Sequence, residues 1–129
     1  MPNDISAELI QLTQRLLQSI TGADWKTYAE LCDESLTAFE PEARGQLVVG
    51  LPFHKFYFDR GASGSPSNTT LCSPHVRMLG DDAAVISYTR LTQRLDNAGR
   101  PETTESQETR IWQRRDGRWR HVHFHRSRP

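Results

Sequence analysis

The Asp116-Gly117 pair near the carboxyl end constrains the fold of this chain more than any other feature. It separates two strand-like runs, and an Asp-Gly pair supplies the positive φ angles that a type I′ turn needs. The sequence therefore predicts a β-hairpin over residues 108–127. Arginines recur among the aromatic and aliphatic residues of this hairpin, where a sheet should be building a core. A buried guanidinium group is costly unless an anion meets it, so the hairpin also indicates a place for negative charge.

The length and the cysteines bound the class of protein. With 129 residues, the chain is long enough to form a single domain, residues 1–129, with its own core. Cys32 and Cys72 show no CxxC spacing, and no apolar leader or long apolar run is visible. We therefore expect a cytoplasmic protein with free thiols.

The formal net charge is zero, which argues against a general nucleic-acid or membrane binder because such proteins usually carry a basic excess. The distribution is uneven: residues 1–59 contain four Lys or Arg against nine Asp or Glu, and residues 60–129 contain twelve against seven. Fourteen of the sixteen basic residues are arginines, the type suited to forked pairing with carboxylates.

The spacing of apolar residues predicts helices first and strands afterwards. A long helix is expected from Asn3 or Asp4 to Thr21, a shorter one after Asp24 with Leu31 or Cys32 on its inner face, and a third from Pro52 to about Arg60. A flexible loop should follow at residues 61–68. Strands are expected at residues 36–39, 70–79, 83–95, 103–115 and 118–126. This order predicts an α+β fold.

Period-two alternation places one arginine among apolar residues on each of three strands: Arg90 with Ala84, Ile86 and Tyr88; Arg110 with Glu108 and Trp112; Arg126 with Val122 and Phe124. If these faces line the concave side of one sheet, the three guanidinium groups converge on an aromatic-lined pocket, where a carboxylate relieves their repulsion. Taken by itself, alternation favours a simpler arrangement. In that arrangement each arginine pairs with a neighbouring Asp or Glu or reaches solvent.

Alternate histidines, His121, His123 and His125, suggest a metal site because alternate residues place three imidazoles on one side of a strand. At about 3.3 Å per residue, the outer two lie about 13 Å apart, too far to share one zinc ion. Spacing picks out no acidic or cysteine partner. We expect structural or interface histidines, with no metal and no cofactor.

A general base would have to come from His54, in the aromatic segment 53–58, or from Glu40, Glu42 or Glu108. His54 is otherwise a packing histidine or a hydrogen-bond donor in the cavity. Neighbouring arginines keep a carboxylate ionised, which weakens it as a base. Kinase motifs, a phosphate-binding glycine loop, a serine elbow and HExxH are absent from the sequence. We therefore expect no enzyme and no catalytic residue, with catalysis in the pocket kept open as the alternative.

Several ordered segments closely resemble the association, or hub, domain of calcium/calmodulin-dependent protein kinase II: residues 36–43, 53–58, 108–119 and 122–127. The resemblance covers nearly the whole chain. It implies a cone of the NTF2-like and ketosteroid-isomerase-like kind, in which a curved antiparallel sheet wraps a long N-terminal helix. It also implies a non-catalytic domain whose dimers close into two stacked rings of roughly twelve or more subunits.

Members of this family have arginines and a histidine in a deep cavity. Matching the family motifs to this sequence, the resemblance implies that the arginines correspond to Arg90, Arg110 and Arg126 and the histidine to His54. The resemblance implies that this pocket accepts a small carboxylate or an acidic segment. Animal members carry a tryptophan in the loop after the aromatic helix, whereas residues 61–68 contain no aromatic residue, which puts gating by that side chain in doubt. Since no kinase or calmodulin-binding segment precedes Pro2, we expect an excised, designed or free-standing hub.

Two hypotheses follow. In the first, the chain is a self-assembling scaffold whose pocket binds an anion. In the second, it is a ketosteroid-isomerase-like enzyme with His54 or Glu108 as the base and the arginines binding an anionic substrate. The fold hosts both kinds of function, so the fold alone does not choose between them.

Overall fold

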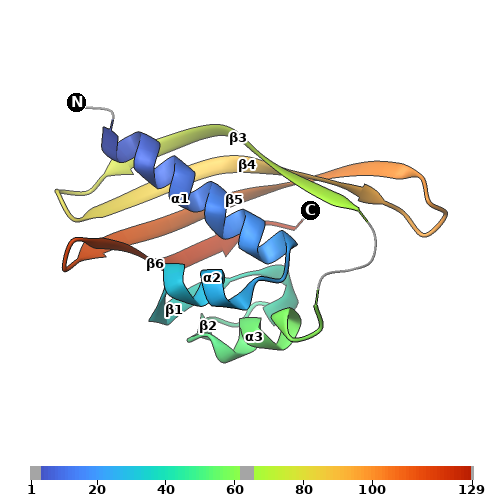
Figure 1. Cartoon of the computed structure of the whole chain (residues 1–129), viewed down its shortest axis with the longest axis horizontal. Coiled ribbons are helices and arrows are strands. Elements are labelled where there is room, and N and C mark those ends of the chain that lie inside the picture. Colours follow the sequence, from blue (N-terminus) through green and yellow to red (C-terminus); the bar gives the residue numbers. More distant parts are fainter. Residues whose placement is uncertain (1–3, 62–65, 129) are drawn as a thin grey trace.

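The computed structural model describes residues 4–61 and 66–128, and it has the expected α+β architecture (Figure 1). A curved six-stranded sheet wraps around the longest helix. Asn3, a candidate cap of that helix, and residues 62–65 of the predicted loop lie outside the described residues. The elements are α1 (Asp4–Thr21), α2 (Trp25–Leu31), β1 (Cys32–Phe39), a 3₁₀ turn η1 (Pro41–Ala43), β2 (Val48–Val49), α3 (Pro52–Phe58), β3 (Ser67–Met78), β4 (Ala83–Leu95), β5 (Pro101–Arg115) and β6 (Arg118–Arg126).

Helix α1 lies across the concave face of the sheet because one side of it is apolar (Figure 1). Leu9, Leu16 and Leu17 are buried, whereas polar residues face away from the sheet. Thr13 Oγ1 lies 3.2 Å from Trp112 Nε1 and accepts its hydrogen bond, so the helix satisfies a fully buried indole N–H of β5. This contact places α1 over the centre of the sheet.

Helix α2 ends one residue before Cys32, although Cys32 was a candidate for its inner face. Asp24 caps α2 as expected, and its carboxylate accepts a hydrogen bond from Thr27 N at 3.2 Å. Cys32 instead has extended backbone (φ −97°, ψ 146°) and begins β1, where it pairs with His121 of β6. Pairing of Cys32 with the distant strand β6 therefore ends α2 at Leu31.

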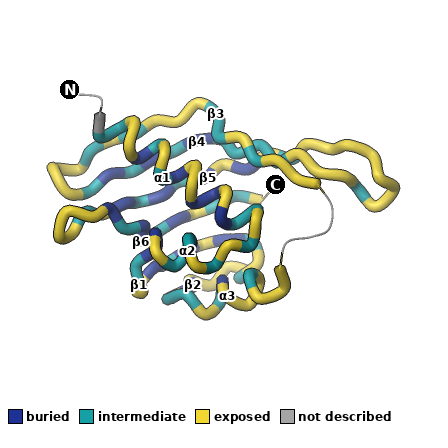
Figure 2. The backbone as a smooth tube through the Cα atoms, viewed as in Figure 1, coloured by how far each residue is buried: buried dark blue, intermediate teal, exposed yellow. Residues whose placement is uncertain are grey.

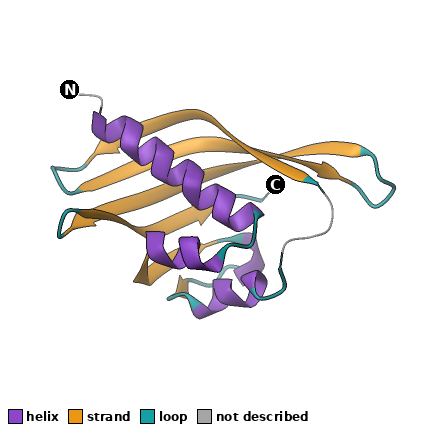
Figure 3. Cartoon of the chain, in the orientation of Figure 1, coloured by secondary structure: helices purple, strands orange, loops and turns teal. Residues whose placement is uncertain are grey.

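The sheet has the strand order β2-β1-β6-β5-β4-β3 (Figure 3). Its neighbouring strands are antiparallel except β1 and β6, which run parallel, so the expected antiparallel sheet is mixed at this one pairing. Parallel strands have their carboxyl ends at the same edge. As a result Glu40 and Glu42, which follow β1, lie beside Arg126 at the end of β6.

Strands β5 and β6 form the predicted hairpin. Asp116 (φ 53°) and Gly117 (φ 75°) both lie in the left-handed region that a type I′ turn requires, and Arg115 pairs with Arg118 across the turn. The structure therefore confirms the turn that the Asp-Gly pair predicts.

A β-bulge farther along this hairpin makes the predicted grouping of three histidines wrong. Trp112 pairs with His121 and Ile111 pairs with His123, so the alternation of β6 changes phase at Val122. His121 is fully buried, whereas the rings of His123 and His125 pack against the half-exposed ring of Phe39. Within residues 4–61 and 66–128, no group of three His, Cys, Asp or Glu side chains is arranged to hold a metal ion.

Burial is greatest where the sheet meets the helices, and the tip of the β4–β5 hairpin is exposed (Figure 2). The core includes Leu16, Tyr28, Ile86, Trp112 and Phe124. Among the described residues, no helix combines the length and the apolar character needed to span a bilayer.

Candidate functional site

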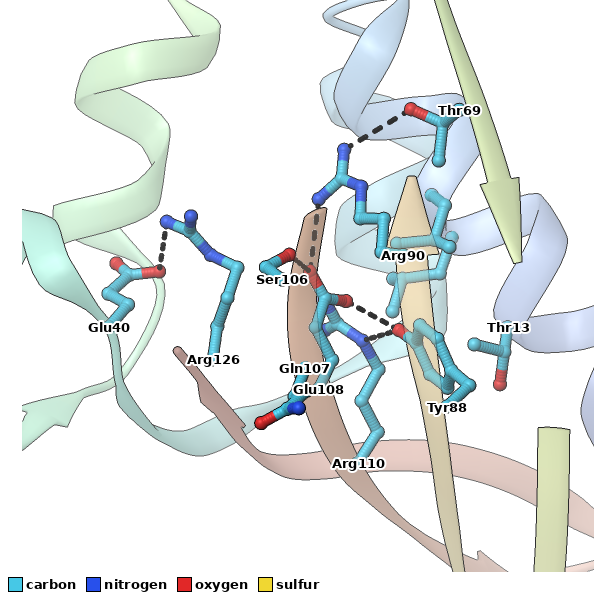
Figure 4. A network of polar contacts seen from close by, with 12 residues as sticks. Thr13, Glu40, Thr69, Tyr88, Arg90, Ser106, Gln107, Glu108, Arg110 and Arg126 are labelled. Carbon is cyan, nitrogen blue, oxygen red and sulfur yellow. Dashed lines mark hydrogen bonds and ion pairs between the residues drawn. The ribbon is translucent and has the colours of Figure 1, made fainter. Parts of the chain in front are cut away.

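A cavity of about 270 Å³ lies between the concave face of β4, β5 and β6 and the helices α1, α2 and α3. Its wall contains the four residues that the sequence placed in a pocket: Arg90, Arg110, Arg126 and His54. The three arginines project from three adjacent strands (Figure 4). Their predicted convergence is therefore present in the structure, whereas their binding of a ligand stays a prediction.

Arg110, on β5, is 1% exposed and is held from every side. Its Nε donates to Tyr88 Oη at 2.8 Å, and its Nη2 donates to Glu108 Oε1 at 3.0 Å. The guanidinium carbon also lies 4.5 Å from the centre of the Phe124 ring. These contacts fix the guanidinium plane and meet the cost of burying its charge.

Glu108 is the counter-charge for two arginines. Besides Arg110, its carboxylate accepts hydrogen bonds from Tyr88 Oη at 2.5 Å and from Arg90 Nη1 at 3.3 Å (Figure 4). Burial by itself raises the pKa of Glu108, but the charges of Arg110 and Arg90 outweigh that effect and lower the pKa to about 2. Glu108 is therefore an ionised structural partner and a poor general base, which removes one of the two bases of the enzyme hypothesis.

Arg90, on β4, is more exposed than Arg110 and less completely bonded. Its side chain is 13% exposed, and its Nη2 lies 3.5 Å from Thr69 Oγ1 of β3. Its Nε is buried without a hydrogen-bond partner among the described residues. Arg90 therefore shares the Glu108 carboxylate with Arg110 and still has an N–H donor, Nε, without a partner among the described residues.

Arg126 ends β6, and two carboxylates from the segment after β1 lie beside its 17% exposed side chain. It contacts Glu42 directly. Its Nη2 also lies 4.0 Å from Glu40 Oε2 (Figure 4). Burial raises the pKa of Glu42, but the hydrogen bond and charge of Arg126 outweigh it, so the pKa is lowered. The parallel β1–β6 pairing is the feature that brings these three groups together.

His54, on α3, completes the cavity wall and is 7% exposed. Its Nε2 lies 2.9 Å from Glu40 Oε1, an ion-pair distance. The alignment of these atoms is not that of a hydrogen bond, and neither ring nitrogen of His54 has a hydrogen-bond partner among the described residues. Tyr28, Phe53 and Phe124 pack around the imidazole, with ring centres 5.5–6.0 Å away.

The sequence analysis did not find His121, which supports Arg110 from behind the cavity. A guanidinium group can only donate, so His121 Nε2 accepts from Arg110 Nη1 at 3.3 Å, and Nδ1 carries the proton toward Cys32 Sγ at 3.4 Å. Burial and the charge of Arg110 lower the pKa of His121, which keeps the ring neutral. Burial also raises the pKa of Cys32 to about 12. The bulge at Val122, which no sequence pattern marks, is what turns His121 inward.

A profile of the family described as the calcium/calmodulin dependent protein kinase II association domain matches residues 5–129. The delta subunit of this kinase from Oryctolagus cuniculus is 52% identical over 122 residues, which cover 93% of this chain and 23% of the subunit. The chain thus spans about a quarter of the length of that relative, which also has other parts.

Solved structures of related association and hub domains are similar to this chain in both fold and sequence. The association domain of the Caenorhabditis elegans kinase superposes with a TM-score of 0.90 at 46% identity over 95% of each chain. The hub homology domain from Chlamydomonas reinhardtii has a TM-score of 0.90 at 48% identity, covering 96% of this chain and 98% of that one. An NTF2-like superfamily protein from Salmonella enterica, at 21% identity and a TM-score of 0.79 over 100% of this chain and 94% of that one, shows the fold alone. The chain therefore has the NTF2-like fold and belongs to the calcium/calmodulin-dependent protein kinase II association domain family.

Proposed function

We propose that this chain is an oligomerisation scaffold, whose dimers assemble into two stacked rings of roughly twelve or more subunits. Membership of the association domain family is the observation that carries this proposal. The family is named an association domain, and the Chlamydomonas relative is named a hub homology domain. We take both names to mean that the domain joins subunits.

An exposed apolar surface supports the proposal. On the outer side of the sheet edge, Phe39, Leu47 and Val49 are 37%, 48% and 68% exposed, while the alternating Ala38 and Val48 are buried. The β1–β2 ladder pairs Thr37 with Val49 and Ala38 with Val48, and the same register continued by one residue brings Phe39 beside Leu47. We treat these three exposed side chains as one surface, here called the β1–β2 patch. Apolar side chains gathered on one face fit a surface that another copy covers.

The test is native mass spectrometry of the purified chain at micromolar concentration, with Val49→Glu as the disrupting variant. A charge in a covered apolar patch should shift the distribution from large rings to smaller species. Gln11→Glu, at an exposed position of α1, is the matched control and should leave the rings intact. A monomer or an isolated dimer for the parent chain contradicts the ring.

We further propose that the cavity binds a small carboxylate or an acidic segment of a partner. Arg90 and Arg126 face it with partly used donors, and the unpartnered nitrogens of His54 lie in its wall. The rings of Tyr28, Phe58 and Phe124 line the rest of it, which suits an anion with an apolar body.

Calorimetric titration with benzoate tests the pocket. We expect saturable binding that Arg126→Gln weakens by at least about tenfold, because a charged hydrogen bond to the ligand is lost. Arg15→Gln, at an exposed ion pair between α1 and α2, is the control and should bind like the parent. Equal binding by the two variants contradicts the role of Arg126.

A further inference from the structure

The cavity already holds a balanced set of charges. Three guanidinium groups and three carboxylates contact one another in and around it: Arg90, Arg110, Arg126, Glu40, Glu42 and Glu108. A further cation of the wall, Arg94, lies 3.2 Å from Glu102. With His54 neutral, these groups sum to zero charge.

This balance has a consequence for any anion that enters. A carboxylate would bring one uncompensated negative charge into a site whose guanidinium groups already have carboxylate partners. Burying an uncompensated charge is costly, whereas a carboxylate that enters with a proton leaves the site neutral. The ligand must therefore displace a resident carboxylate or bind together with a proton.

The geometry favours the proton for a ligand that contacts His54. Glu40 and His54 are both more than nine-tenths buried, so neither side chain can swing into solvent without rearrangement. Glu42, by contrast, is 39% exposed, and its displacement from Arg126 by a ligand would take up no proton. The His54 Nε2 and Glu40 Oε1 atoms are 2.9 Å apart, close enough for one added proton to convert this contact into an ion pair. The other ring nitrogen, Nδ1, is buried and has no partner among the described residues, so a protonated imidazole can donate through it to a second acceptor.

The charges around His54 come from four directions. The segment after β1 contributes Glu40 and Glu42, which favour a positive imidazole. Strands β4, β5 and β6 contribute Arg90, Arg110 and Arg126, which oppose it. The other titratable side chains near it in the described part of the chain include Tyr28 of α2, Tyr57 of α3 and the neutral His121 of β6. A ligand carboxylate adds a further negative charge beside His54 and therefore favours the positive imidazole.

We propose that the pocket binds a carboxylate together with one proton, which the His54–Glu40 pair holds. This inference rests on the proposed anion-binding function and makes Glu40 a specificity-determining residue. The resident carboxylates thereby disfavour anions at high pH, when the proton is scarce. Carboxylate binding and proton uptake are reciprocal, so affinity should fall by up to about tenfold for each pH unit over the range in which a full proton is taken up.

The experiment is calorimetric titration of the whole chain with benzoate, in buffers of different ionisation enthalpy, from pH 6 to pH 8. The slope of the observed enthalpy against the buffer ionisation enthalpy gives the number of protons taken up, and we expect about one. Saturable binding with zero proton uptake and unchanged affinity across this range would overturn the inference while leaving the proposed pocket intact. Absence of binding at pH 6 would overturn both.

Two Glu→Gln variants locate the proton. Glu40→Gln removes one resident negative charge, so we expect proton uptake near zero and binding at pH 8 at least about tenfold tighter than in the parent. Glu30→Gln, at an exposed ion pair with Arg15, is the matched control and should keep the proton uptake of the parent. Parent-like proton uptake in folded Glu40→Gln would contradict the role of this pair. Should that variant not fold, the proton count of the parent chain still decides the coupling.

Discussion

Glu108 contacts both Arg90 and Arg110, so removing its charge leaves the buried Arg110 and the partly exposed Arg90 with one counter-charge fewer. Glu108→Gln keeps the volume and one hydrogen-bond acceptor while deleting that charge. Since the carboxylate is fully buried, solvent cannot replace it without rearrangement. This substitution therefore tests the electrostatic core of the pocket with little change in packing.

Two independent arguments give the size of the effect. Lowering a carboxyl pKa from 4.5 to about 2 corresponds to about 3 kcal/mol in favour of the ionised folded state. Removing one partner of a buried ion pair costs about 3–5 kcal/mol. We expect Glu108→Gln to lower the free energy of unfolding by about 3 kcal/mol at pH 7.

The effect should depend on pH with a definite sign. The pKa of Glu108 is lower in the folded state than in the unfolded state, so its contribution is complete above the unfolded value and is lost as the pH falls toward 2. The stability difference between the parent and Glu108→Gln should therefore shrink as the pH is lowered from about 5.

Urea unfolding at one fixed protein concentration measures this difference, because association would otherwise shift the apparent stability. Glu102→Gln is the control: it breaks an exposed pair with Arg94 and should cost less than about 1 kcal/mol. A cost for Glu108→Gln below about 1 kcal/mol at pH 7, or one that does not change with pH, would refute the reasoning.

Three further predictions concern the scaffold around the pocket. Thr13→Val leaves the buried Trp112 N–H without its acceptor, so urea unfolding should show a free energy of unfolding lower by about 1–3 kcal/mol. Thr13→Ser keeps the hydroxyl and should be close to the parent. Equal loss in both variants would contradict this. Gly117→Ala should cost about 1–2 kcal/mol through backbone strain alone, because an added Cβ meets nothing within 4 Å; no loss in the same assay would argue against the turn. Burial raises the pKa of Cys32 to about 12, so its thiol should not react in the folded chain. In a Cys72→Ser variant, which leaves Cys32 as the one cysteine, a thiol reagent at pH 8 should label the chain only after unfolding. Rapid labelling of the native chain would exclude a buried thiol.

Strand alternation grouped Arg90 and Arg110 correctly on β4 and β5, although by itself it favoured arginines paired with neighbouring carboxylates, and such pairs are present as well. Tyr88 and Glu108 are direct partners across β4 and β5, so the faces assigned from period two meet on the concave side. The family resemblance then singled out Arg90, Arg110 and Arg126. The helices were predictable for similar reasons, since caps such as Asp24 act within one turn.

Contacts between distant segments were not predictable in this way. The parallel pairing of β1 with β6 joins residues more than eighty positions apart. It decides that Cys32 begins a strand instead of extending α2, and it decides which carboxylates reach Arg126. The bulge at Val122 depends on the same packing, and it places His121 behind Arg110. No local signal in the sequence marks either feature.

The central claim is that this member of the association domain family assembles into rings. Native mass spectrometry of the unmodified chain at micromolar concentration tests it most directly. The account predicts a narrow set of even-numbered assemblies of roughly twelve or more subunits. A spectrum of monomers or isolated dimers only would contradict it.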